Sequence, residues 1–186
     1  MSSIIHKHAQ RARLSTALDQ LLRDYSIPSP RADLIRQRIE GLEAELTALD
    51  QEIKAMPLEL KEVIELTSGE HHGQAFIVHA LRPGNGIIEV VLQHLDNDGL
   101  RTLTDQELAA FGFRRSAKWS GKGCVPAIKS DVFVRMNGLG PATVVDHEIV
   151  EGWLGLRVRF HTPPAWWVKQ NRGHRPLGLI FGAEIR

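Results

Sequence analysis

A heptad repeat near the beginning of the chain limits the possible folds more than any other feature. Seven apolar residues recur at alternating spacings of four and three, the period of a helix that packs along one seam. They are Ile35, Ile39, Leu42, Leu46, Leu49, Ile53 and Met56. Charged residues lie between them, and Pro57 follows, which cannot continue a helix. The sequence therefore predicts a helix that ends near Pro57 and needs a helical partner.

That partner can come from the same chain or from a second copy of it. An earlier amphipathic helix carries an apolar stripe formed by Leu14, Ala17, Leu18, Leu21, Leu22 and Tyr25. Pro28 interrupts the stripe, and Ser29 followed by Pro30 is a favourable start for the next helix. The short connection favours an intramolecular hairpin. A two-stranded coiled coil or a dimer of hairpins stays open, with oligomerisation through Ile35, Ile39, Leu42, Leu46, Leu49 and Ile53.

The compartment is inferred by elimination. The single cysteine, Cys124, excludes an internal disulfide and any all-cysteine metal site. No apolar stretch approaches the roughly 20 residues that a membrane span needs, and the first residues lack the apolar run of a signal peptide. We therefore expect a cytoplasmic protein with no membrane partner.

Residues 58–123 read as a central β-rich segment. Runs of β-branched and apolar residues predict strands at 63–67, 75–80 and 87–92, and an Asn-Gly pair at 85–86 marks the turn before the last of these. Thr104 and Glu107 form a capping box ahead of a short helix, and Gly112 suits the end of that helix. The basic residues that follow are expected in a connecting loop.

Residues 124–186 predict a small, strongly bent β-barrel. Short strands are expected at 131–136, 142–149, 153–160 and 177–181, separated by glycine-rich turns. Pro163 and Pro164 would remove hydrogen-bond donors from a sheet, so this segment is expected to form a 3₁₀ turn or a short helix. The predicted fold class is α+β, with a helical arm (1–57), a central segment (58–123) and a barrel (124–186).

The beginning of the barrel segment carries a family resemblance. Its valines and glycines alternate through Val132, Val134, Met136, Gly138 and Gly140, and Pro141-Ala142-Thr143-Val144-Val145 follows. This pattern resembles the opening of SH3-like barrels of the KOW and CarD type, with a strand, a Gly-x-Gly turn and a valine-rich strand. Residues 155–160 are similar to their third strand. The resemblance implies an architecture used to bind RNA, DNA or transcription proteins, and it places no functional residue.

The formal net charge of +1 conceals a strong asymmetry. Residues 31–112 hold 7 Lys/Arg and 15 Asp/Glu, whereas residues 113–186 hold 12 Lys/Arg and 5 Asp/Glu. Such a separation indicates a polyanionic partner or the association of acidic and basic faces. The densest basic stretch runs from 113 to 123 and contains Arg114, Arg115, Lys118, Trp119 and Lys122. Its cations could neutralise phosphates and its indole could stack on a base, or the stretch could be a connector with Trp119 packed inside.

A second aromatic and basic cluster lies near the C-terminus. Trp166 and Trp167 are adjacent, and the cations Lys169, Arg172 and Arg175 follow them. In one interpretation one tryptophan is buried and the other is exposed to a protein or nucleic-acid partner. In the other, both rings fill the core.

Metal binding and catalysis are not favoured by the sequence. Nine histidines are present, but their spacing does not predict the three or four convergent ligands that zinc requires. The only candidate nucleophile set is Cys124 with His147 or His161 and a carboxylate, and a lone cysteine is more often buried filler. We therefore expect no cofactor, no metal and no enzymatic activity.

The sequence thus predicts a non-enzymatic protein that binds the phosphate backbone of DNA or RNA through its basic C-terminal half. The proposed contacts are Arg114, Arg115, Lys118, Trp119, Lys122, Lys169, Arg172 and Arg175. The alternative is a protein–protein adaptor that grips its partner with Trp166 and Trp167. The first prediction requires the cations to gather on one exposed face, whereas an exposed Trp166 or Trp167 over an apolar patch favours the second. Cations that are masked by the acidic middle of the chain would favour a scaffolding role instead.

Overall fold

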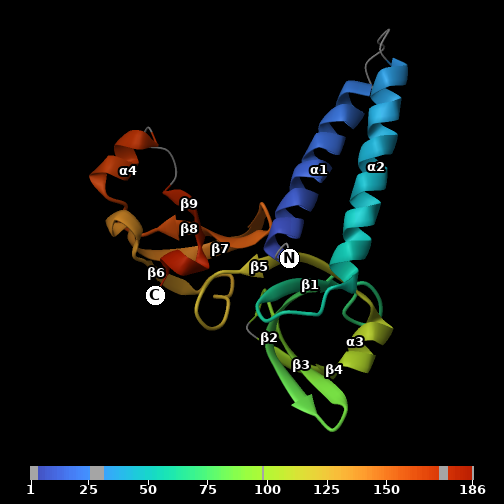
Figure 1. The fold of residues 1–186 in the computed structure, drawn as a ribbon. Helices are drawn as coiled ribbons and strands as arrows, with labels where there is room; N and C mark the ends of the chain where they lie inside the picture. Colours follow the sequence, from blue (N-terminus) through green and yellow to red (C-terminus); the bar gives the residue numbers. More distant parts are fainter. Residues whose placement is uncertain (1–3, 26–31, 98, 172–175, 186) are drawn as a thin grey trace. The chain divides into compact units, whose positions relative to one another are not determined.

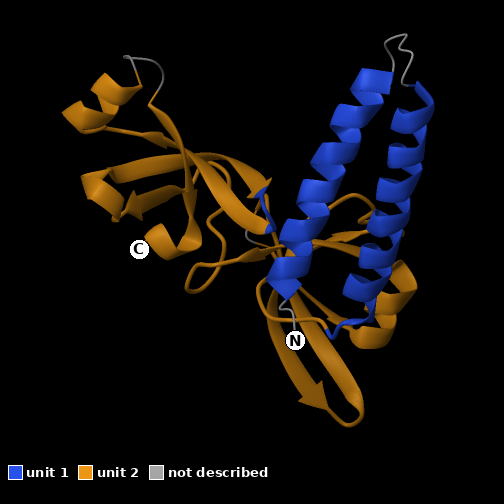
Figure 2. Ribbon diagram, turned by 45° about the horizontal axis from the view of Figure 1, so that its top comes forward, with its two compact units in different colours: residues 1–57, 150–152 blue, residues 58–149, 153–186 orange. Residues whose placement is uncertain are grey.

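The structure, a computed structural model, describes residues 4–25, 32–97, 99–171 and 176–185. The chain forms two compact units, residues 1–57 with 150–152 and residues 58–149 with 153–186 (Figure 2). The predicted α+β class is confirmed, because two long helices precede a sheet-rich body (Figure 1). Within the described ranges no helix combines the length and apolarity needed to cross a membrane.

The first unit is a pair of helices. Helix α1 (Ile4–Tyr25) and helix α2 (Ala32–Ala55) run antiparallel and side by side (Figures 1 and 2). Helix α2 ends just before Pro57, as the sequence predicts, whereas α1 begins well before the predicted stripe that starts at Leu14. The predicted N-cap at Ser29 and Pro30 lies outside the described residues.

Helix α1 covers the heptad seam of α2 within a single chain. Ile39, Leu42, Leu49 and Ile53 are buried, and Ile35 and Leu46 are half-buried. Near the start of α1, Ile4 packs against Leu49 and Ile53. Ion pairs from Lys7 to Glu52 and from Arg11 to Asp50 flank this contact. The seam is thus occupied by an intramolecular hairpin, and its predicted use in oligomerisation stays a prediction.

The second unit is built on one sheet with the strand order β4-β3-β2-β1-β5-β8-β7-β6, and β9 also pairs with β8. The strands are β1 (Glu62–Leu66), β2 (Ala75–Gly84), β3 (Ile87–His94), β4 (Leu100–Thr104), β5 (Phe113–Trp119), β6 (Asp131–Val134), β7 (Gly140–Val150), β8 (Trp153–Phe160) and β9 (Leu177–Phe181). Two short helices accompany them, α3 (Asp105–Phe111) and α4 (Ala165–Gln170). The capping box of α3 is present, with Thr104 and Glu107 bonded to each other's backbone N–H.

Two hydrophobic cores meet at β1. Val63 packs into a core with the buried Trp119 and Phe160, whereas Ile64 and Leu66 pack into a second core. Successive side chains of a strand point to opposite faces, so a strand that is apolar on both faces belongs between two cores. This position explains why β1 is almost entirely buried.

Two sequence expectations about the sheet need correction. Residues 113–119, expected in a connecting loop, form β5, which lies between β1 and β8 and pairs with β8 in parallel. The predicted boundary at 123–124 is therefore spanned by one sheet. The predicted C-terminal barrel is not confirmed, because the sheet does not close within the described residues. A single bridge between Val134 and Ile185 links β6 to the segment after β9.

Candidate nucleic-acid interface

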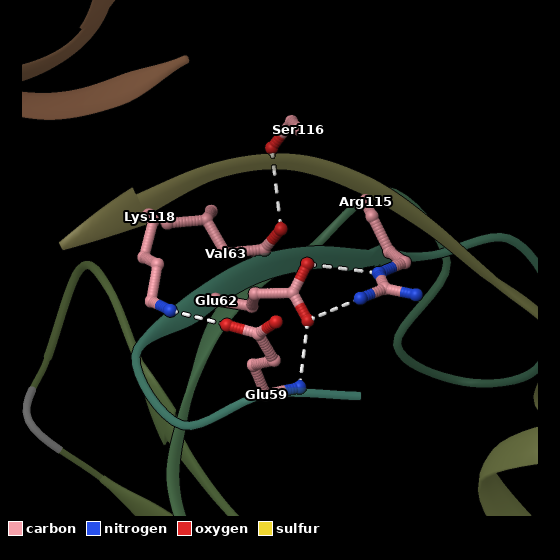
Figure 3. A network of polar contacts seen from close by, with 6 residues as sticks. All are labelled: Glu59, Glu62, Val63, Arg115, Ser116 and Lys118. Carbon is pink, nitrogen blue, oxygen red and sulfur yellow. Dashed lines mark hydrogen bonds and ion pairs between the residues drawn. The ribbon is translucent and has the colours of Figure 1, made fainter. Parts of the chain in front are cut away.

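Strand β5 carries the densest basic stretch of the chain, and it pairs directly with the acidic strand β1. The two strands run antiparallel, with Glu62 opposite Lys118 and Glu65 opposite Arg114. The register shifts between Val63 and Ile64, which leaves an extra residue on β5, the arrangement of a β-bulge. Figure 3 shows the resulting network of polar contacts between the two strands and the segment before β1.

The centre of this network is a buried ion pair. The Arg115 guanidinium donates from Nε to Glu62 Oε1 at 2.8 Å and from Nη2 to Glu62 Oε2 at 2.6 Å. The backbone N–H of Glu59 donates to the same carboxylate at 2.8 Å. Glu62 is 0% exposed and Arg115 5% exposed. A bidentate pair with further hydrogen bonds can offset the large cost of burying two charges.

The contact with nucleic acid predicted for Arg115 is therefore wrong. Its guanidinium faces the Glu62 carboxylate inside the protein, where a phosphate cannot reach it unless β1 and β5 separate. The other two cations of β5, the exposed Arg114 and the half-buried Lys118, also have carboxylate partners. Arg114 Nη2 lies 2.6 Å from Glu65 Oε2, and Lys118 forms an ion pair with Glu59. The sequence prediction missed these partners because they lie 49 and 59 residues away, on β1 and on the segment before it.

Trp119 also differs from its predicted role. It is 1% exposed and packs in the core that contains Phe160, so it offers no face for a base. Gly121 lies over its indole so closely that a Cβ at position 121 would approach the ring to 2.5 Å. The alternative interpretation, a tryptophan tucked inside the protein, is the one that fits.

The loop after β5 is anchored rather than loose. The Lys61 ammonium donates to the Gly121 carbonyl at 2.7 Å. The buried Gln93 side chain bonds to both backbone groups of Val125, donating to its carbonyl at 2.8 Å and accepting from its N–H at 3.1 Å. Lys122 is exposed between these two anchors. Of the residues predicted in the stretch 113–123, Lys122 thus presents its charge at the surface, and Arg114 and Lys118 present charges that are shared with carboxylates.

In the second predicted cluster, around Trp166 and Trp167, one tryptophan is packed against the sheet and the other is exposed. Trp167 is partly buried and meets Phe160 edge to face with ring centroids 5.0 Å apart. Trp166 is 39% exposed and Lys169 is exposed three residues further along α4. Residues three apart lie on the same face of a helix. Arg172 and Arg175 lie outside the described residues.

The surroundings of this cluster contain few acidic groups. Residues 153–186 hold six Lys/Arg and one Asp/Glu, a formal balance of +5. The one acid, Glu184, accepts a hydrogen bond from the backbone N–H of Phe181 at 2.7 Å. On β8, Arg157 forms an ion pair with Glu148, and Arg159 is exposed. Among the described cations here, Arg159 and Lys169 are exposed, whereas Arg157 and the three cations of β5 are paired with carboxylates.

The candidate nucleophile set of the sequence is not assembled. His147 Nε2 lies 2.9 Å from the Pro126 carbonyl oxygen, and His161 Nε2 lies 2.8 Å from Thr143 Oγ1. The neighbour of Cys124 is instead His79, whose Nδ1 lies 3.7 Å from Sγ. Both residues are exposed. Across the described ranges, no three His, Cys, Asp or Glu side chains converge as metal ligands would.

No protein-family model matches the chain, and no curated protein resembles it at a significant level.

Proposed function

We propose that this protein is a non-enzymatic nucleic-acid-binding protein whose contact surface lies in residues 153–186. The observation that carries the proposal is the formal balance of +5 in this segment, beside an exposed tryptophan on a short helix. Nucleic-acid backbones carry a dense row of phosphates, and clustered cations bind them by releasing condensed counterions. The stretch 113–123 contributes less than its composition indicates, because carboxylates of β1 and the segment before it pair with three of its four cations.

The predicted resemblance to KOW- and CarD-type barrels agrees with this function, since those architectures bind nucleic acids or transcription proteins. Fold resemblance alone is weak evidence for function, so the proposal depends on charge and on the exposed ring. No element that reads base edges was identified in the sequence. We therefore expect contacts to the backbone to dominate, with little sequence preference.

The test is a fluorescence anisotropy titration of the full-length chain with labelled oligonucleotides. If four to six cations contact phosphates, affinity should fall by roughly 50- to 1,000-fold between about 50 and 200 mM salt. Binding that is insensitive to salt would contradict a backbone contact. The absence of any binding to single or double strands at the lower salt concentration would overturn the proposal.

A second function, that of a protein–protein adaptor, is favoured by a specific observation. Phe133 on β6 is 50% exposed, Met136 38% and Val168 43%, in addition to Trp166. Exposed apolar side chains of this size support protein interfaces when they are contiguous. An adaptor would bind its partner in high salt, which separates this function from the first.

A further inference from the structure

Helix α4 holds one tryptophan inside the protein and presents the other. The helix follows Pro163 and Pro164, and the backbone N–H of Trp167 donates to the Pro164 carbonyl at 2.9 Å. At the other end, Asn171 donates to the Trp167 carbonyl from both its backbone N–H, at 2.9 Å, and its side chain, at 3.0 Å. These bonds fix a helix that is too short to be stable by itself.

Trp167 anchors this helix to the sheet. Its ring meets Phe160 of β8 edge to face at an interplanar angle of 69°. Gly178 of β9 allows the close approach, because a Cβ there would come within 3.1 Å of Trp167 Cη2 and 2.7 Å of the Phe160 ring. A residue larger than glycine at position 178 would push the indole away. The position of α4 is thus set by aromatic packing against two strands.

Trp166 packs edge to face against Trp167 and remains partly exposed. Its ring meets that of Trp167 at 77°, with centroids 5.7 Å apart. The residue nevertheless keeps 39% of its surface exposed. A tryptophan that is already restrained loses little conformational entropy when a planar ligand stacks on it. Such a ring is suited to a flat partner with a π face.

One described cation near this ring points to the class of ligand. The exposed Lys169 lies on the same helical face as Trp166. The sequence adds Arg172 and Arg175, which lie outside the described residues. Nucleotides in a nucleic-acid chain combine these two properties, because each carries a flat aromatic base and a negatively charged phosphate. In a duplex the base faces are covered by neighbouring pairs, whereas in a single strand they are free to stack on a side chain.

We propose that Trp166 is a stacking platform for an unpaired base, and that the protein therefore prefers single-stranded over double-stranded nucleic acid. This inference rests on the proposed function, because it requires the segment 153–186 to bind the backbone. It explains how the protein could distinguish single-stranded from double-stranded nucleic acid, which charge alone does not do. Cations attract both, whereas the exposed ring favours the single strand, whose bases are free to stack on it.

The test compares Trp166→Ala and Trp166→Phe with the unmodified full-length chain, using a labelled thymidine 20-mer and a duplex of the same length. Stacking contributes enough that Trp166→Ala should weaken single-strand binding by about tenfold. Duplex affinity should change less than about twofold, since backbone contacts remain. Trp166→Phe retains a smaller ring and should recover most of the loss.

A matched control is Phe133→Ala, which removes an even more exposed aromatic ring from β6 and should leave both affinities unchanged. Thermal unfolding by circular dichroism confirms that each variant is folded. The stacking inference is overturned if Trp166→Ala weakens single-strand and duplex binding equally, or if it weakens neither. In both cases salt-dependent binding by the unmodified chain would still support the proposed function. If the unmodified chain binds neither oligonucleotide, the proposed function fails first.

Discussion

Strand β5 and residues 153–186 are both rich in cations, yet they differ in what surrounds those cations. On β5, Arg114, Arg115 and Lys118 each face a carboxylate of β1 or of the segment before it. In residues 153–186 a single acid accompanies six cations, and that acid bonds to the backbone of its own segment. The described cations of β5 are thus paired within the protein, whereas Arg159 and Lys169 of the other region are exposed to solvent.

A basic stretch is therefore evidence for a polyanion-binding site only when the spatial partners of its cations are known. Ion pairs between neighbouring strands cancel charge at short range, and they also contribute to the pairing of the strands. A cation whose charge is cancelled by a carboxylate gains little from meeting a phosphate, because it must first lose its existing partner.

Glu62→Ala should cause the largest loss of stability in this network. The substitution leaves the Arg115 guanidinium buried without the carboxylate that balances it, and breaking a buried pair in this way costs about 3–5 kcal/mol. The free energy of unfolding, measured by urea denaturation monitored by circular dichroism, gives the value directly.

The control for that experiment is Glu65→Ala, which removes one partner of the more exposed pair with Arg114. Exposed ion pairs contribute about 0–1 kcal/mol, so the two glutamates of one strand should differ several-fold in cost. Equal losses of stability would show that the burial of Glu62 does not control the energetics of the network. A Glu62→Leu, Arg115→Met double variant removes both charges and should recover part of the loss.

Much of the fold followed from patterns that are local in the sequence. The heptad spacing predicted α2 and its end near Pro57, and the capping box predicted the start of α3. The strands near 63–66, 75–80 and 153–160 were indicated by their β-branched and apolar residues. Such features depend on neighbours a few positions away, which a single sequence contains.

The role of β5 could not be predicted in the same way. Ala117 and Trp119 alternate as in a half-buried strand, but Arg115 interrupts the apolar pattern at a position that proves to be buried. Its burial depends on Glu62, a residue of another strand, and on a bulge that no local pattern reveals. The candidate site was therefore predicted where charge was dense along the chain, while the structure shows that the cations of β5 are paired with carboxylates.

Lys169→Ala should weaken binding to nucleic acid, and Arg114→Ala should not. Loss of one phosphate contact should lower the salt slope by about 1 and reduce affinity a few-fold at moderate salt. Both substitutions remove one positive charge from an exposed side chain, so they are matched in net charge. Anisotropy titrations at several salt concentrations measure both effects. A larger loss from Arg114→Ala than from Lys169→Ala would reverse the comparison between the two regions.

The smallest effect is expected from releasing the cations of β5. The double variant Glu59→Gln, Glu65→Gln removes the carboxylate partners of Lys118 and Arg114 while it keeps the shape of both side chains. If ion pairs with carboxylates prevent the cations of β5 from binding phosphates, the freed cations should raise affinity for an oligonucleotide about twofold. They should also steepen the salt dependence of that affinity.

A matched change of charge elsewhere distinguishes this effect from a general one. Glu40→Gln, Glu45→Gln removes two charges from exposed positions of α2 that are not predicted to contact nucleic acid. Repulsion between these carboxylates and the phosphates is screened beyond about 10 Å at 0.1 M salt. This control should therefore gain less affinity than the Glu59→Gln, Glu65→Gln variant. An equal gain from both variants would mean that net charge, rather than the release of particular cations, controls binding. The pairing of β1 with β5 would then be a structural feature without consequence for the choice of ligand.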